Sequence, residues 1–172
     1  MALLLEQAQI VVAVRPVDLS TAANNGDWIS VKNYKHVAIL FHSAIGTAGQ
    51  DPTLTINQGT AVAGTGTKAL SIGSTKAFKK QAATDLTATE VWTSASADLS
   101  TNTWTNATSA EQETLVVVEF DTDELDVDGG FDCIQAAIAK VGANAQLGAC
   151  YYILTEPRFP AAPVNMLSAI VD

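Results

Sequence analysis

The chain has 172 residues, of which 48% are hydrophobic and only 16% are charged. This length suits one domain with a substantial core, so we predict a single domain over residues 1–172 with N-terminal and C-terminal arms. Nine Lys and Arg against eighteen Asp and Glu give a formal net charge of −9. Because such a surface offers few cations that could bind phosphates, we do not expect nucleic acid as a partner.

The first predicted strand covers residues 9–15. Its alternate apolar residues are expected to share one face, and they are Ile10, Val12 and Val14. Pro16 should end this strand, because proline has no backbone N–H to donate to a sheet. Before it, the apolar run 1–5 is short and is interrupted by Glu6, so we expect neither a signal peptide nor a membrane span.

A central strand is predicted within residues 28–42, with a bend at Asn33. After the bend, three apolar side chains should share one face, namely Val37, Ile39 and Phe41. Further strands are predicted at residues 53–58, 69–78, 89–93 and 103–108. The first of these alternates cleanly, with Leu54 and Ile56 directed inward.

Residues 113–158 contain three apolar runs around an acidic turn and organise the predicted fold. The last two runs, 133–141 and 146–154, predict a hairpin in which Cys133 and Cys150 are not opposed. Both thiols are therefore predicted to be reduced and buried. Alanines favour a helix over 133–140, but the alternation of the apolar residues favours a strand.

The pattern as a whole gives roughly eight or nine short strands without a good amphipathic helix. We therefore predict an all-β fold, an antiparallel double-sheet sandwich. A jelly roll fits the number of strands best, and an immunoglobulin-like sandwich is the alternative. The cysteine–tryptophan–cysteine framework of antibody domains is absent, which favours the jelly roll.

The charged residues are segregated along the chain. Acidic residues fill the stretch 111–132, whereas the stretch 52–84 carries only lysines. Two interpretations stay open: separate solvated loops, or complementary patches that meet across subunits or on another protein. On the second interpretation the interaction candidates are Asp121, Asp123, Asp126, Asp128, Lys76, Lys79 and Lys80.

The acidic turn resembles the start of a calcium-binding loop in its spacing. Asp126, Asp128 and Asp132 stand at liganding positions, but the first position is Glu124 and the twelfth is Gln135 instead of a bidentate glutamate. The open interpretations are a loose calcium site in a β-loop or a solvated turn. No other cofactor or metal is expected.

No catalytic constellation emerges from the sequence, and we expect a protein that is not an enzyme. His36 and His42, the only histidines, lie on one face of the predicted central strand, roughly 20 Å apart. They cannot share one proton or one metal ion at that distance. Trp28, Trp92 and Trp104 are expected either in the core or as anchors that face a partner.

Three segments together resemble a family of tailed-bacteriophage virion proteins: GTAGQDPTLTINQ at 46–58, the stretch 109–154, and SAIVD at 168–172. The resemblance implies a head decoration or cement protein, many of which are jelly rolls. It further implies a homo-oligomer that binds the major capsid protein on the exterior of the virion and is made in the host cytoplasm, with no membrane partner. A tail or head-fibre base module is the alternative. A carbohydrate-binding sandwich would instead show an aromatic platform around Trp92 or Trp104, or a carboxylate pair in a cleft.

Overall fold

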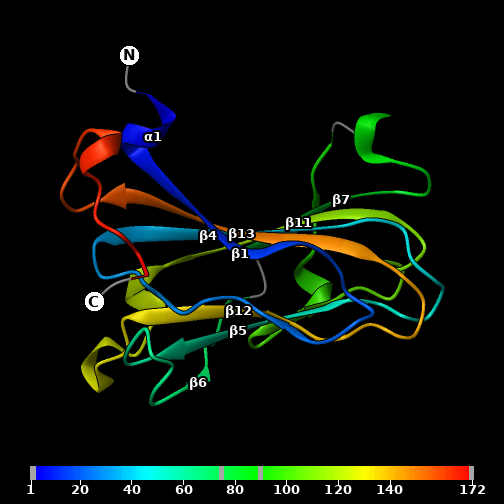
Figure 1. Cartoon of the computed structure of the whole chain (residues 1–172), viewed down its shortest axis with the longest axis horizontal. Coiled ribbons are helices and arrows are strands. Elements are labelled where there is room, and N and C mark those ends of the chain that lie inside the picture. Colours follow the sequence, from blue (N-terminus) through cyan, green and yellow to red (C-terminus); the bar gives the residue numbers. More distant parts are fainter. Residues whose placement is uncertain (1–2, 74–75, 89–90, 171–172) are drawn as a thin grey trace.

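The computed structural model describes residues 3–73, 76–88 and 91–170. Within these residues the strands form two antiparallel sheets that pack face to face as a sandwich (Figure 1). Only short helical segments accompany them: α1 (Leu4–Gln7), η2 (Leu86–Ala88), η3 (Ser96–Asp98), η4 (Thr122–Glu124), η5 (Val127–Gly129) and η6 (Pro163–Asn165). The all-β sandwich predicted from the sequence is confirmed.

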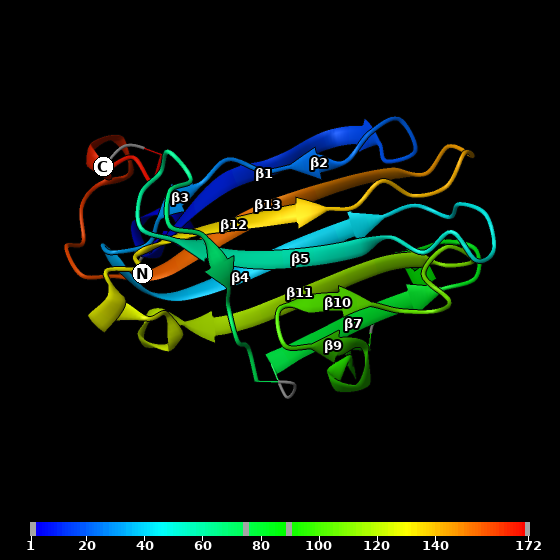
Figure 2. The same ribbon diagram turned by 90° about the horizontal axis from the view of Figure 1, so that it is seen from below.

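Sheet A is six-stranded. Its strands, in spatial order, are β1 (Ala8–Asp18), β13 (Leu147–Pro157), β4 (Tyr34–Ser43), β11 (Glu113–Asp121), β7 (Ala77–Ala82) and β8 (Thr93–Ser94). Sheet B, seen in front in Figure 2, has the order β2 (Asn24–Asn25), β12 (Cys133–Ile138), β5 (Thr53–Gly59), β10 (Thr103–Thr105) and β9 (Leu99–Ser100). In addition, β3 (Ile29–Ser30) pairs with β12, and β6 (Lys68–Ala69) pairs with β5.

Strands from the two ends of the chain lie side by side in both sheets. Strand β1 lies beside β13, β13 beside β4, and β4 beside β11, while in the other sheet β2 lies beside β12, β12 beside β5, and β5 beside β10. The chain thus crosses between the sheets repeatedly, from β1 to β2, β3 to β4, β4 to β5, β10 to β11, β11 to β12 and β12 to β13, and the long strands pair with strands distant in sequence. This is the double Greek key of a jelly roll, the preferred prediction.

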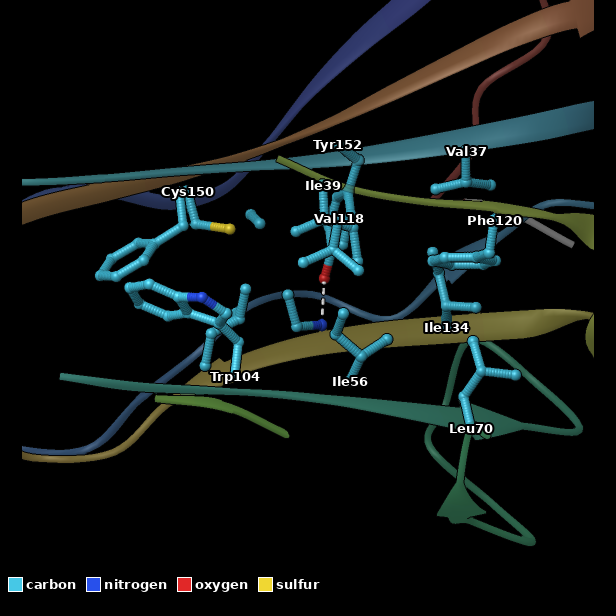
Figure 3. Packing of buried hydrophobic residues seen from close by; sticks show 14 of the residues in the cluster. Val37, Ile39, Ile56, Leu70, Trp104, Val118, Phe120, Ile134, Cys150 and Tyr152 are labelled. Carbon is cyan, nitrogen blue, oxygen red and sulfur yellow. Dashed lines mark hydrogen bonds between the residues drawn. The ribbon is translucent and has the colours of Figure 1, made fainter. Parts of the chain in front are cut away.

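The core lies between the sheets and is built from alternate residues of the long strands. Val37, Ile39 and Phe41 on β4 are fully buried, as predicted, and so are Leu54 and Ile56 on β5. Strand β11 contributes Val116, Val118 and Phe120. Figure 3 shows these layers meeting, with Trp104 packed edge-on against Phe41 at a ring-centroid distance of 6.2 Å.

One hydrogen-bonded side chain crosses this apolar core. Tyr152 extends from β13 toward sheet B, where its hydroxyl accepts a hydrogen bond from the Ala136 backbone N–H at 2.7 Å (Figure 3). The same hydroxyl donates to the Asp27 carbonyl at 3.0 Å. Burial raises the pKa of Tyr152, so the phenol keeps its proton and can serve both partners. The two sheets are thereby joined by directional bonds as well as by packing.

The first strand differs from its prediction. It continues through Pro16 to Asp18, and its register with β13 shifts between Val12 and Val14 and again between Val14 and Val17. Such bulges reverse the alternation of side chains, so Val14 faces the core whereas Ile10 and Val12 face outward. Pro16 is tolerated because β1 is an edge strand, where a missing N–H breaks no pairing on the open side.

The predicted hairpin between 133–141 and 146–154 is wrong. Both segments are strands, β12 and β13, but β12 belongs to sheet B and β13 to sheet A, so the connection crosses from one layer to the other. The cysteines are nevertheless free and buried, as predicted. Burial raises the pKa of the Cys150 thiol to about 12, which keeps it protonated and inert.

The strand predicted at 69–78 is wrong in its middle part. Ala69 ends β6, and Leu70 and Ile72 are buried but lie in a connection. Residues 74–75 lie outside the described residues, and the next strand is β7, which includes Lys79 and Lys80. Residues 89–90 of the strand predicted at 89–93 lie outside the described residues, and 93–94 form β8. The strand predicted at 103–108 is shorter, ending at Thr105.

Both arms contact the sandwich. Helix α1 leads directly into β1, and near the other end of the chain the Ala169 carbonyl accepts a hydrogen bond from Ser30 N–H at 2.6 Å. Ala169 itself is buried. In the described part of the chain, no helix combines the length and the apolar character that crossing a membrane requires.

We predict that Tyr152→Phe lowers the free energy of unfolding by about 1–3 kcal/mol, because it leaves the buried Ala136 N–H without its partner. Urea denaturation measures the effect. Tyr151→Phe is the matched control, since the Tyr151 hydroxyl makes no hydrogen bond within the described residues. Equal stability of both variants would show that the Tyr152 hydroxyl contributes nothing across the core.

Candidate functional site

The acidic and lysine-rich segments meet within the same chain. Lys68 pairs with Asp126, Lys76 pairs with Glu124, and Lys79 Nζ lies 2.5 Å from Asp98 Oδ2. The topology causes this arrangement: β7 lies beside β11, and β6 continues the sheet that contains β12, so both lysine segments border the acidic connection. The complementary patches inferred from the sequence therefore face each other inside one molecule.

Asp126 is held in place by several partners at the start of η5. Its carboxylate pairs with Lys68 and accepts a hydrogen bond from Gly129 N–H at 3.1 Å, and these two interactions lower its pKa. Its backbone N–H donates to Gln58 Oε1 at 2.9 Å. Lys68 also lies 4.0 Å from the centre of the Phe131 ring. Asp126 thus has a clear structural role in shaping the acidic connection.

The seven interaction candidates fall into two groups. Asp121, Asp126, Lys76 and Lys79 are engaged within the chain, Asp121 through a 2.9 Å hydrogen bond to His36 that lowers its pKa. The exposed carboxylates of Asp123 and Asp128 have no ion pair or hydrogen bond in the part of the chain that the structure describes. Lys80 stacks over Trp92 at 5.1 Å and has no carboxylate partner there either. The second group is therefore the part left for a partner.

The three calcium candidates do not converge on one point. Asp126 is paired with Lys68, and Asp132 accepts a hydrogen bond from the Cys133 thiol at 3.2 Å. Over residues 3–73, 76–88 and 91–170, no group of three or more His, Cys, Asp or Glu side chains could hold a metal ion. The geometry favours the solvated-turn interpretation, with Asp128 directed to solvent.

The two histidines lie on the outer face of sheet A, each with its own acids. His36 Nδ1 lies 2.9 Å from Asp121 Oδ1, and its Nε2 lies 3.6 Å from Glu119 Oε2. His42 Nε2 lies 2.7 Å from Glu113 Oε1. Among the described residues, neither imidazole contacts a Ser, Thr or Cys side chain. A histidine–acid pair without a nucleophile is not a hydrolytic triad.

An apolar surface on the outer side of sheet A was not predicted. Five side chains form one row across sheet A, because they are opposed pairwise in the strand registers: Val12, Tyr151, Leu40, Val117 and Phe78. The row above it contains Ile10, Ile153 and Ala38, and the row below contains Leu115. We call these nine residues, together with Trp92, the apolar face. It occupies the middle of the outer side of sheet A, with the histidines and charged side chains on either side of it along the strands.

The apolar face is exposed at both of its ends. Val12 is 51% exposed and Phe78 42% exposed, and Trp92 beside Lys80 is 43% exposed. The outer side of sheet B is different, since its long strands present polar side chains there: Thr53, Thr55, Asn57, Thr103, Thr105 and Gln135. The contrast shows that sheet A, unlike sheet B, has a second face suited to burial.

A signal for the apolar face exists in the sequence. Strands of sheet B, such as 53–58, alternate between apolar and polar residues, whereas 37–41, 115–118 and 150–154 are apolar at consecutive positions. Continuous apolar runs are typical of strands that are buried on both sides. The runs were correctly predicted to be strands, but the burial of their second face was not inferred from them.

The tryptophans divide between core and surface. Trp104 is fully buried, so it cannot belong to a carbohydrate-binding platform, and Trp28 packs against Gly59 and Gly64. Only Trp92 is largely exposed, and it belongs to the apolar face. A groove of about 920 Å³ lies between α1 and residues 155–162, and two carboxylates line it, those of Glu6 and Glu156. Glu6 is occupied by a 2.9 Å hydrogen bond from Leu3 N–H.

Comparison with known proteins gives only distant likenesses. No family model matches the chain, and no curated protein matches it. Among solved structures, the chain is similar to the SPBc2 prophage-derived protein YomS, with a TM-score of 0.43 and 9% identity over 87% of this chain and 93% of that one. It is also similar to a structure of infectious bursal disease virus Gt strain, with a TM-score of 0.27 and 11% identity over 94% of this chain and 44% of that one. At these scores neither likeness bears on function.

We predict that Lys79→Met lowers the free energy of unfolding more than Lys68→Met does. The side chains of Lys79 and Asp98 are 16% and 17% exposed, so removal of the lysine leaves a largely desolvated carboxylate, at a cost of about 1.5–3 kcal/mol. Lys68 and Asp126 are 42% and 43% exposed, and loss of that pair should cost under about 1 kcal/mol. Urea denaturation at low salt compares the variants, and the reverse order would contradict this reading of burial.

Proposed function

We propose that the chain is a virion structural protein of a tailed bacteriophage, namely a decoration or cement protein that attaches to the lattice of the major capsid protein. The sequence resemblance of segments 46–58, 109–154 and 168–172 supports the virion class. The jelly-roll sandwich supports a rigid module for assembly.

One observation carries the proposal. The molecule offers surfaces for protein partners, and its candidate polar groups are mostly bonded to each other instead of forming a reaction centre. In the described part of the chain, the histidines and most of the candidate charges are bonded to partners in the same chain. The apolar face of sheet A, by contrast, exposes Ile10, Val12, Phe78 and Trp92. Apolar patches of this extent on soluble proteins mark contacts with other proteins.

The acidic connection between β11 and β12 is the proposed contact with the shell. Asp123 and Asp128 are exposed there and have no intrachain partner among the described residues. Uncompensated carboxylates on a rigid support speed docking to basic surfaces and fix its orientation. Repetition over a lattice then adds avidity that a single contact lacks.

We predict that purified virions contain this chain in lattice numbers. Quantitative mass spectrometry should give a copy number equal to that of the major capsid protein or to a simple fraction of it. A few copies per particle would instead identify a tail or head-fibre base module, and absence from virions would contradict the virion assignment altogether.

We predict that the double substitution Asp123→Asn and Asp128→Asn weakens attachment to undecorated shells by about tenfold at low salt, because it removes two free charges from the contact. Co-sedimentation of the protein with shells measures the binding. The double variant Asp27→Asn and Glu111→Gln is the matched control, since it removes two exposed charges elsewhere. Equal binding by both variants and the wild type would exclude the acidic connection as the contact.

A further inference from the structure

We propose that the apolar face of sheet A is the interface of a symmetric dimer of this chain, in which two sheets A pack face to face about a two-fold axis that runs across the strands. This inference goes beyond the proposed function and does not depend on it. It assigns an occupant, a second copy, to a surface that the monomer leaves open.

The size of the apolar face suits a dimer. Six strands at the usual spacing of about 4.8 Å make the sheet roughly 25 Å wide. Three rows of side chains, spaced by about 7 Å along the strands, give an outer side of roughly 500 Å² on each copy. The apolar residues fill its middle row and parts of the rows on either side. Two such outer sides together reach the area of about 1,000 Å² that a specific interface needs.

The charges around the apolar face are arranged for self-recognition. On one side of the Val117 row, β11 carries Glu119, and on the other side β4 carries His42 and β7 carries Lys80. A two-fold axis along this row exchanges the two sides. Glu119 of each copy then lies over Leu115 of the second copy, next to Lys80 on the neighbouring strand, so a Glu119–Lys80 pair can form twice. Within its own copy, Glu119 lies 3.6 Å from His36. Further from the row, Asp121 and Glu113 are each already bonded to a histidine.

The two segments that project from the outer side of sheet A fit the same axis. Helix α1 stands beside β1 at one end of the strands, and η2 stands at the other end, where Leu86 N–H bonds to Glu113 (Figure 1). The two projections therefore occupy diagonally opposite corners of the sheet. Rotation about an axis across the strands brings each projection to a bare corner of the second copy, so the projections of the two copies do not meet each other.

Analytical ultracentrifugation of the full chain tests the dimer. The wild type should sediment at twice its 18.0 kDa mass. Val117→Asp, which places a charge at the centre of the face, should sediment as a monomer. Thr55→Asp, the same kind of change on the polar outer side of sheet B, should remain dimeric. If circular dichroism shows that Val117→Asp is unfolded, Val12→Asp at the exposed end of the row replaces it.

A charge exchange tests the axis. Lys80→Glu and Glu119→Lys should each raise the dimer dissociation constant by about tenfold, since each variant breaks two equivalent pairs. The double variant, which restores opposite charges across the axis, should return to within about threefold of the wild type. A monomeric wild type, dimers unaffected by aspartate at the row, or no recovery in the double variant would overturn the proposal. If the wild type is monomeric and Val117→Asp abolishes binding to shells, the capsid is the occupant.

Discussion

The structure depends on one phenol group that completes a sheet from the opposite layer. Strand β12 pairs with β3 at Cys133 and Ile134 and with β2 at Ala137 and Ile138, and between these short strands the edge is interrupted. The Tyr152 hydroxyl fills the interruption by binding Ala136 N–H, while Gly26 N–H binds the Ala136 carbonyl at 2.9 Å. A side chain at Gly26 would collide with both groups, which explains the glycine there. An unsatisfied N–H at this depth would cost about 1–3 kcal/mol.

This crossing bond ties β13 of sheet A to β12 of sheet B. Strand β13 lies between β1 and β4, so the two ends of the chain and its middle are joined in one sheet. The inward side chains of β13 pack in the core around Tyr152. Its outward side chains, among them Tyr151 and Ile153, are apolar as well. The outer side of sheet B differs, because threonines there alternate with the core residues along β5.

The strands could be predicted because alternation and apolar runs are local properties of the sequence. Leu54 and Ile56 were predicted to face inward and Val37 and Ile39 to share one face of a central strand, and all four are buried. Partnership between strands could not be predicted in the same way. The connection between β12 and β13 contains no tight-turn signal, and it crosses between layers, so proximity in sequence gave the wrong hairpin. Bulges in β1 reversed its exposed face for a similar reason, since a bulge leaves no clear mark in composition.

The charge pairs and the apolar face depend on the topology, so they could be predicted only in part from the sequence. Lys68 and Asp126 are distant in sequence, and only the adjacency of β6, β5 and β12 brings them together. The segregation of acids and lysines was evident from the sequence, but its consequence, pairing within the chain, required the fold. What remains unpaired is then a better guide to partners than the total charge of the segment.

The two proposed contacts lie on different parts of the molecule and are compatible. The apolar face occupies the middle of the outer side of sheet A, whereas Asp123 and Asp128 lie in the connection beyond the end of β11. A two-fold axis across the strands sends the acidic connections of the two copies to opposite ends of the dimer. Such a dimer would present two acidic sites that point to different neighbours, and a bivalent contact of this kind gains avidity from a shell without any stronger individual bond. Dimerisation through the apolar face would in this way let one dimer link two lattice subunits through two weak electrostatic contacts.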